Sequence, residues 1–440
     1  MLSYGGVQFA STIFLAFLSF YPLVLLTDVA LIPPAIAGIL LSGLRLFSAV
    51  GDQAIGIYIN RVDLKGGKYR PWIRVCALPH SICLIAVGLT PGFNLMGKII
   101  YAALALALCE LFRSLFNIAA TSMLPYMADA DEERVKYISF STAFSIIAYL
   151  LISTFMLPLV NFLGKLGAGL GGWDNQRIGF ALAFVLFAII AAPLCYNAYY
   201  RLSEGSYNKS MDKQPILQLY AVIIKNKRLI LFFISYCLYS AADAFRSLTT
   251  YHYVLYNLGH PEFITFIIMA GILSPLAMQL VIPRLLLFAK KETLIIASLF
   301  VASALSLIFS IFFNGPYELI VLAVLYGIFT AVMANLAYAM VASFADEMRE
   351  RHNIQMSDVL SATLSLSYKV GAAIAGGAAP IIMAIYGYSA GNAQQPAAVL
   401  ASIKMIYFTF SASGLALAAI AMLFVRVGSK RTAPVPNNPL

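Results

Sequence analysis

The chain has 440 residues, of which 61% are hydrophobic and only 11% are charged. Soluble domains carry roughly 25% charged residues, so this composition excludes an ordinary globular protein. Apolar runs of about 18 residues or more recur along the whole length, a pattern that indicates many membrane-spanning helices. The net charge of +10 could suggest a nucleic-acid partner, unless the basic residues gather in loops on one side of a membrane.

The apolar runs predict twelve spans, so we expect an all-α membrane protein. The longest polar break divides the spans into two groups of six, and the turns after the second and eighth spans resemble each other. This repeat favours the major facilitator fold, with 12 transmembrane helices in two six-helix bundles around a solute site. The expected domains are an N-terminal bundle at 1–200, a cytoplasmic linker at 201–228, a C-terminal bundle at 229–427 and a cytoplasmic tail at 428–440. The expected spans are about 4–26, 32–58, 71–93, 97–127, 137–164, 176–200, 229–257, 261–288, 291–313, 317–344, 358–388 and 397–427.

Basic residues are unevenly distributed between the loops on the two sides of these spans. Most lie in the even-numbered loops, the linker and the C-terminal tail, whereas the opposite loops hold only Lys98, Lys165 and Arg177. The positive-inside rule therefore places both termini in the cytoplasm. This distribution explains the net charge without nucleic acid. We expect a multi-pass monomer in the lipid bilayer of a plasma membrane, a bacterial inner membrane.

Polar side chains inside the spans recur at helical intervals, which places them on one face of each helix. A charged group at the bilayer centre costs about 2.5–3.5 kcal/mol, so it should face a cavity or a partner. We therefore interpret Asp52, Arg113 and Lys369 as residues of a transport pathway. Asp243 and Arg246 are either functional or a self-neutralising pair, and helix packing is the alternative for the hydroxyl residues. The polar sets are Gln8, Thr12 and Ser19; Arg45, Ser48 and Asp52; Glu110, Arg113, Asn117 and Thr121; Ser139, Thr142 and Ser145; Ser240, Asp243, Ser247 and Thr250; and Ser361, Ser365 and Lys369.

The corner after the second span, residues 61–72, combines glycines, basic residues and a Pro-Trp pair. Two adjacent glycines permit a tight turn, and the basic side chains can lie against helix C-terminal carbonyls or neighbouring acids. On these grounds the corner is either a gating hinge or simply a stable turn. Its gating residues are expected to be Arg61, Gly67, Lys68 and Arg70.

The segment "RLFSAVGDQAIGIYINRVDLKGGKYRPW", residues 45–72, resembles the hallmark of the glycoside-pentoside-hexuronide:cation symporters, the melibiose permease family of the major facilitator superfamily. The segments "LPYMADADEERVKY", "NKRLILFFISY" and "SYKVGAAIAG" extend the resemblance over essentially the whole chain. The resemblance implies a secondary active transporter that works by alternating access around a central cavity. It also implies no cofactor other than a coupling ion, H⁺ or Na⁺.

The resemblance assigns the coupling cation to acids on the second span and a hydroxyl on the fourth. By position, Asp52 matches the second acid, Ser48 stands where the first acid is expected, and Ser114 matches the hydroxyl. Because Na⁺ prefers several oxygen ligands including carboxylates, the lost acid favours H⁺ over Na⁺. Arg45 and Lys369 match basic residues of the family and are expected to tune the proton affinity of Asp52.

The solute site departs further from the family pattern. The acids and the Arg that bind sugar in the family correspond by position to Thr12, Asn117 and Thr142, and both tryptophans lie at span ends. A glycoside or uronide is the solute that the resemblance implies. Because the span interiors carry more basic than acidic residues, a non-sugar organic anion or a lysolipid-like amphiphile stays open, as does an uncoupled facilitator. The expected solute-binding residues are Thr12, Arg113, Asn117, Thr142, Asp243, Arg246 and Lys369.

Enzyme function is the remaining alternative class. A membrane enzyme needs acid and base residues clustered with a nucleophile or a metal. The four histidines are scattered, and the five cysteines lie in apolar segments without metal-ligand spacing. We therefore expect no catalytic residue and no metal site.

Overall fold

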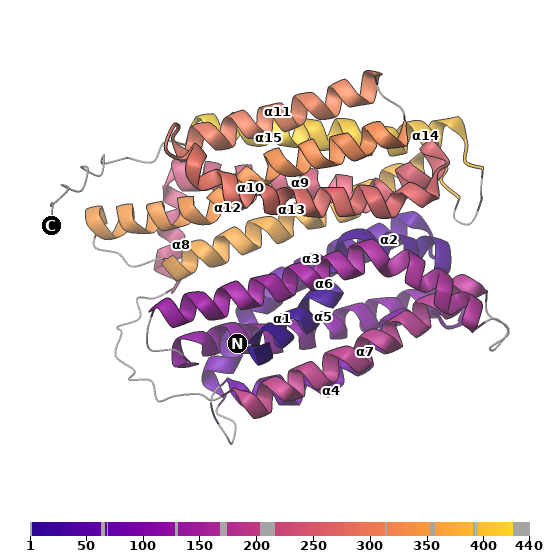
Figure 1. The fold of residues 1–440 in the computed structure, drawn as a ribbon, viewed down its shortest axis with the longest axis horizontal. Coiled ribbons are helices and arrows are strands. Elements are labelled where there is room, and N and C mark those ends of the chain that lie inside the picture. The colour runs from indigo at the N-terminus through magenta and orange to yellow at the C-terminus, as the bar shows by residue number, and fades with distance from the viewer. Residues whose placement is uncertain are drawn as a thin grey trace.

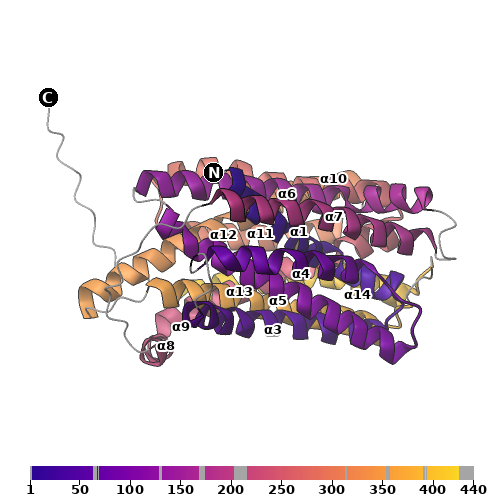
Figure 2. The ribbon, with the colours of Figure 1, turned by 90° about the horizontal axis from the view of Figure 1, so that it is seen from below.

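The computed structural model of the chain is built almost entirely from helices (Figure 1). It describes residues 2–62, 67, 69–127, 131–167, 174–202, 216–312, 315–352, 357–389, 392 and 394–425. Within these ranges, 12 helices are long and apolar enough to cross a membrane, which confirms the predicted number of spans. Viewed from a second direction, the same helices still run along the long axis of the molecule (Figure 2).

The helices are numbered in chain order, and π and 3₁₀ segments carry the letter η. Those of the N-terminal bundle are α1 (Leu2–Phe20), α2 (Pro22–Val24), η1 (Leu25–Val29), α3 (Pro34–Arg61), α4 (Arg70–Gly88), α5 (Leu95–Met127), α6 (Asp131–Leu166) and α7 (Asn175–Arg201). A short helix, α8 (Ile216–Lys225), precedes the C-terminal bundle. That bundle contains α9 (Lys227–His252), η2 (Tyr253–Leu258), η3 (Pro261–Phe263), α10 (Ile264–Leu285), α11 (Lys291–Phe312), α12 (Pro316–His352), α13 (Ser357–Ile385), α14 (Ala397–Lys404), η4 (Met405–Phe410) and α15 (Ser411–Leu423).

The two bundles lie side by side, the N-terminal one in indigo to magenta and the C-terminal one in orange to yellow (Figure 1). They meet mainly through α3 against α13, α6 against α10 and α1 against α9. Helix α8 lies at one end of the molecule, which we call the linker end, and η1 and α14 lie near the opposite, distal end (Figure 1).

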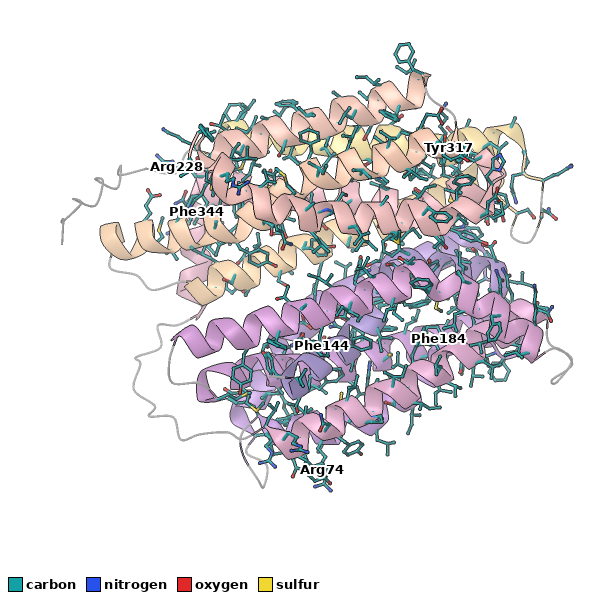
Figure 3. All side chains as sticks on the ribbon, in the orientation of Figure 1. Arg74, Phe144, Phe184, Arg228, Tyr317 and Phe344 are labelled. Atoms are coloured by element: carbon teal, nitrogen blue, oxygen red, sulfur yellow. The ribbon has the colours of Figure 1, made fainter. Side chains whose placement is uncertain are left out.

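Aromatic side chains pack inside each bundle, and Figure 3 labels Phe184 in the N-terminal bundle and Phe344 in the C-terminal one. In the N-terminal bundle Phe184 meets Phe17 edge to face, with ring centroids 4.9 Å apart. In the C-terminal bundle Phe344 packs against Phe232 at 5.5 Å. The largest buried cluster extends from the N-terminal bundle into part of the C-terminal bundle, and a second cluster, which includes Phe232 and Phe344, lies within the C-terminal bundle.

Three predicted spans contain a π-helical segment, and in the seventh it is η2, which continues α9 at Tyr253–Leu258. The first ends at Phe20, because Pro22 has no N–H to continue the helix, and the chain passes through α2 and the π-helical η1 instead. The twelfth contains a π-helical turn, Met405–Phe410, between α14 and α15. Such turns are frequent at functional sites, and all three π-helical segments lie beside groups described below.

The bundles approach most closely where α3 crosses α13 in the distal half. Small residues face each other there: a Cβ on Gly38 would lie 2.8 Å from the carbonyl oxygen of Gly377 and 2.6 Å from Cγ of Pro380. One turn further along α3, the Ser42 hydroxyl donates a 2.7 Å hydrogen bond to the Ala373 carbonyl. Small residues are what allow two helices to pack this closely inside a membrane.

Candidate functional site

A salt bridge crosses the interface between the bundles. Lys369 Nζ of α13 donates to Asp52 Oδ2 of α3, and it also donates to Ser48 Oγ at 2.8 Å. On the other side of the carboxylate, Ser114 Oγ of α5 donates to Asp52 Oδ1 at 2.7 Å. The side chains of Asp52 and Lys369 remain 26% and 16% exposed, so a proton can reach this carboxylate without unfolding the site. The structure thus brings together the three residues predicted for cation coupling and adds Lys369 to them.

A second, more deeply buried pair continues this network inside the N-terminal bundle. Arg113 Nε and Nη2 donate to the two carboxylate oxygens of Glu110 at 2.7 and 2.6 Å, a bidentate geometry. The Ser48 hydroxyl donates to Glu110 Oε1 at 2.5 Å while it accepts from Lys369. Two acids and two bases are therefore connected through one serine, and their formal charges cancel. This is how charges become tolerable at membrane depth.

Glu110 was not predicted as a site residue, although it lies on the polar face of the fourth span. Ser48 stands where the resemblance expects an acid, and Glu110 brings a carboxylate to that place from another helix. The available signal was the three-residue spacing of Glu110 and Arg113, which predicts contact between them. The sequence could not indicate that Ser48 faces the same pair.

A cavity of about 290 Å³ lies between the bundles, and the helices that line it are not those that carry the charged network. Helices α9, α10 and α12 form most of its wall, and Phe20 and Tyr149 of the N-terminal bundle close it. Its polar groups include Asp243, Arg246 and Thr250. It combines aromatic walls with a few convergent polar groups, which is typical of a small-molecule site.

Arg246 is the most distinctive group of this cavity. Its guanidinium lies between two aromatic rings, 4.2 Å from the centroid of Tyr326 and 4.6 Å from that of Tyr407. It is 7% exposed, and within the described ranges neither terminal nitrogen meets a hydrogen-bond acceptor. No ion pair of the described residues joins it to Asp243, which also lines the cavity. The two ring faces stabilise the buried guanidinium, and Asp243 lies near enough to interact with it electrostatically but not in direct contact.

A smaller pocket of about 30 Å³ connects the cavity to the α3–α13 contact. It shares Tyr149, Asp243 and Ser247 with the cavity and adds Arg45 of α3 and Tyr368 of α13. Arg45 Nη2 donates to the Leu18 carbonyl of α1 at 2.9 Å. The residue predicted to tune Asp52 therefore lies two helical turns from it, at the edge of the cavity.

The other predicted solute-binding residues lie elsewhere. Thr12 is buried and donates to the Gln8 carbonyl at 2.7 Å. The Asn117 carbonyl accepts from Thr121 at 3.0 Å, and the side chain of Thr142 is exposed. None of the three lines the cavity described above. Of the predicted set, Asp243 and Arg246 line the cavity, and Arg113 and Lys369 belong to the charged network.

The corner after the second span is described in part. Gly67 has φ 129°, in the region that favours glycine. Arg70 Nε donates to the Tyr199 carbonyl at 2.7 Å, and the Arg70 guanidinium lies 4.7 Å from the centroid of the Tyr199 ring. Both contacts hold the corner against α7. Arg61 ends α3, but its side chain and all of Lys68 lie outside the described residues.

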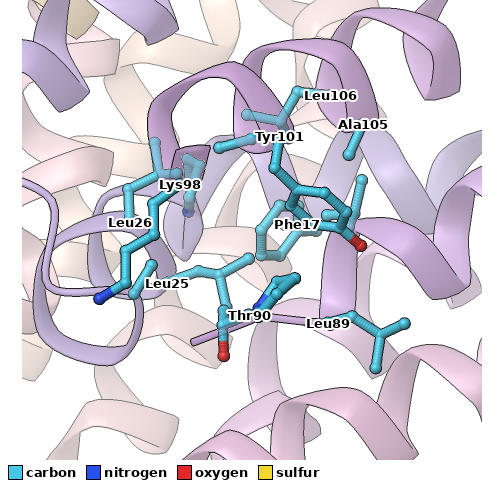
Figure 4. A pocket seen from close by; sticks show the side chains of 14 residues that line it. Phe17, Leu25, Leu26, Leu89, Thr90, Lys98, Tyr101, Ala105 and Leu106 are labelled. Atoms are coloured by element: carbon cyan, nitrogen blue, oxygen red, sulfur yellow. The ribbon is translucent and has the colours of Figure 1, made fainter. Parts of the chain in front are cut away.

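A further pocket lies inside the N-terminal bundle, lined by apolar residues such as Phe17, Leu25 and Leu106 (Figure 4). Its volume of about 30 Å³ is enough for a water-sized group, so it is no candidate for a solute site. Within the described ranges, no group of three His, Cys, Asp or Glu side chains could hold a metal ion.

Comparison with known proteins places the chain among transporters. A family model described as "MFS/sugar transport protein" matches residues 3–429. The isoprimeverose transporter of Lactiplantibacillus pentosus is 25% identical over 432 residues, which cover 97% of this chain and 88% of the relative. The uncharacterized symporter YjmB of Bacillus subtilis is 26% identical over 423 residues, with 95% and 89% covered.

Solved structures resemble the fold. The nucleoside transporter NupG aligns with a TM-score of 0.70 at 15% identity, over 97% of this chain and 99% of that one. The D-xylose-proton symporter aligns with a TM-score of 0.68 at 11% identity, over 96% and 97%. At such identities the likeness concerns the fold alone, and it confirms the predicted helical transporter architecture.

Proposed function

This chain belongs to the MFS/sugar transport protein family, and from that premise we propose that it is a proton-coupled symporter of a small, sugar-sized solute. Membership makes it a multi-pass inner-membrane transporter rather than an enzyme. The geometry of the site supports the proposed coupling ion, solute and alternating access.

The observation that carries the proposal is the salt bridge between Asp52 and Lys369. It joins the two bundles along the contact of α3 with α13. An ionised Asp52 attracts the ammonium and holds the bundles in this arrangement, whereas a protonated Asp52 has no charge to offer. Proton binding therefore biases two arrangements of the bundles differently, which is the requirement for coupling a bound ion to a conformational change.

The geometry favours a proton over Na⁺. Hard cations take oxygen ligands, several of them at once. Here the carboxylate of Glu110 is engaged by Arg113, and Lys369 Nζ lies against both Asp52 and Ser48. A sodium ion would have to displace the ammonium and would find a single free carboxylate. A proton needs only one oxygen of Asp52.

The cavity supports a solute about the size of a monosaccharide. Ligand pockets commonly measure about 300–1,000 Å³, and the volume of about 290 Å³ is at the lower end. This size disfavours a lysolipid-like amphiphile. The rings of Tyr149, Tyr239 and Tyr326 offer faces for a sugar ring, and Asp243 can accept hydrogen bonds from hydroxyl groups. Because both bundles contribute to its wall, the site can open alternately to either side.

An organic anion is the second candidate, favoured by Arg246 alone. A guanidinium without an acceptor in a buried site leaves hydrogen-bond donors unused, and a carboxylate is the group that such a fork binds best. Methyl β-D-glucoside and methyl β-D-glucuronide are a matched neutral and anionic pair for testing this. An anionic solute would be supported if the glucuronide raises the unfolding temperature of the purified protein and Arg246→Gln abolishes this effect. If only the glucoside raises the unfolding temperature, an anionic solute is excluded.

Asp52→Asn tests the coupling proposal once a solute has been found with this screen. In proteoliposomes without Na⁺, the wild type should accumulate the solute when a proton gradient is imposed. The variant should bind and exchange solute but should not accumulate it, because the amide cannot carry the proton. Asp243→Asn is the control, since it changes a cavity carboxylate that does not contact Lys369 and should weaken binding instead. Undiminished accumulation by Asp52→Asn would contradict the proposal.

A further inference from the structure

A buried polar cluster joins the two bundles at the distal end. Asp28 of η1 belongs to the N-terminal bundle, and its Oδ1 accepts a 2.7 Å hydrogen bond from the hydroxyl of Tyr388, which follows α13. His252, the last residue of α9, lies beside the other carboxylate oxygen, with Nε2 3.7 Å from Oδ2. Asp52 is separate from this cluster, since 18 residues of α3 at about 1.5 Å each place it roughly 27 Å from Pro34.

The cluster lacks one hydrogen bond. His252 is fully buried and the side chain of Asp28 is 9% exposed. Within the described residues, Asp28 Oδ2 has no hydrogen-bond partner and His252 Nε2 makes no hydrogen bond to it, although the Leu248 carbonyl of the same helix lies near the ring. An N–H···O bond measures about 2.7–3.2 Å, so the 3.7 Å separation is too long to count as one. Unpaired polar atoms in a buried place are unfavourable, and such groups in native structures call for an explanation.

One acid and three tyrosines surround the imidazole of His252. The titratable groups that contact His252 are Asp28 and three tyrosines: Tyr251 of its own helix, Tyr256 of η2 and Tyr388. The tyrosine ring centroids lie 5.5, 6.2 and 5.8 Å from that of His252. The Asp28 carboxylate attracts a protonated imidazole, whereas burial opposes the charge, so proton binding depends on direct contact between the ring and the carboxylate.

We propose that His252 and Asp28 form a second proton-binding site, separate from Asp52. While a proton is bound, this site holds closed the contact between the bundles at the distal end, which we call the distal gate. A proton on the imidazole turns both ring nitrogens into donors. Closing the Nε2–Oδ2 distance by about 0.8 Å then makes a charge-assisted hydrogen bond between the bundles. Histidine is the side chain that ordinarily changes charge near neutral pH. The gate thus closes behind a proton that enters from the distal side and loosens when the proton leaves.

Amide hydrogen exchange of the purified full-length protein tests this without labels. The peptides to follow cover 21–32 and 252–260, which contain both halves of the cluster. After correction for the intrinsic pH dependence of exchange, protection in the wild type should rise about tenfold or more from pH 7.5 to pH 5.5, the effect of one charge-assisted hydrogen bond. His252→Gln and Asp28→Asn should each abolish the rise. Tyr388→Phe removes only the hydroxyl, so it should lower protection at both pH values and keep the rise.

Three controls separate this site from other titrating groups. His260 lies at the same end, is exposed and pairs with Glu262 at 2.9 Å, so His260→Gln should keep the rise. His80 is equally buried but lies within the N-terminal bundle, and His80→Gln should keep it too. The rise should also persist in Asp52→Asn, which makes the result independent of the coupling proposal. A flat profile in the wild type, or a rise that survives in both His252→Gln and Asp28→Asn, would overturn the inference.

Discussion

Replacing Gly38 by alanine should open the distal contact between α3 and α13. The added Cβ would lie 2.6 Å from Pro380 Cγ and 2.8 Å from the Gly377 carbonyl oxygen. Carbon atoms in van der Waals contact are about 3.5–4.0 Å apart, so the helices must separate by about 1 Å. Overpacking of this kind costs about 1–3 kcal/mol. The cost falls only on the arrangement in which these helices touch, so it should shift the population away from that arrangement by roughly 5- to 140-fold.

Gly43→Ala is the matched control on the same helix, because nothing lies within 4 Å of a Cβ at that position. Both variants gain up to about 1 kcal/mol of helix propensity, which is the same in every arrangement and cancels from the equilibrium between them. Hydrogen exchange over 34–42 and 373–385 should therefore speed up in Gly38→Ala and not in Gly43→Ala. Equal exchange in the two variants would refute the idea that this glycine contact closes the distal end.

Two further predictions concern the coupling network. Lys369→Met should lower the unfolding temperature. Because the side chains of Lys369 and Asp52 are 16% and 26% exposed, the free-energy cost should lie between the roughly 0–1 kcal/mol of exposed ion pairs and the roughly 3–5 kcal/mol of buried ones. Adding Asp52→Asn should recover most of the loss, and additive losses in the double variant would contradict a direct pair. Ser114→Ala removes the 2.7 Å hydrogen bond to the ionised carboxylate of Asp52. The pH at half-maximal proton-driven uptake should therefore move upward by about one to two pH units. Ser42 donates its hydroxyl to the Ala373 carbonyl instead, so Ser42→Ala should leave this pH unchanged.

The fold could be predicted from the sequence because each membrane span is a long run of apolar residues. Each span is an apolar run that periodicity and length identify without knowledge of its neighbours. The interruptions were not predicted: Pro22 and the π-helical turn at Met405–Phe410 lie inside apolar runs, where hydropathy stays high although the hydrogen-bond register changes. A pattern of hydrophobicity records which residues face lipid, and it does not record a change of helical pitch.

The site was predictable one helix at a time. Helical spacing placed Ser48 with Asp52, and charge inside a span singled out Lys369, but the contact of Lys369 with both depends on how α13 crosses α3. Asp28 illustrates the limit. It falls between two predicted spans, where an acid is expected to be solvated, and only the three-dimensional arrangement brings it against His252.

Two helices, α3 and α13, link the cavity with the proposed coupling site. Tyr368 lines the small pocket that adjoins the cavity, and the next residue on α13 is Lys369, which holds Asp52. Arg45 lines the same pocket, two turns before Asp52 on α3. A solute that draws Tyr368 or Arg45 toward the cavity would pull on α13 or α3, and a movement of either helix would change the geometry of the salt bridge. Energetic coupling carried by packed, rigid elements needs no direct contact between solute and proton, so residues lining the small pocket should alter coupling even where they leave solute affinity unchanged.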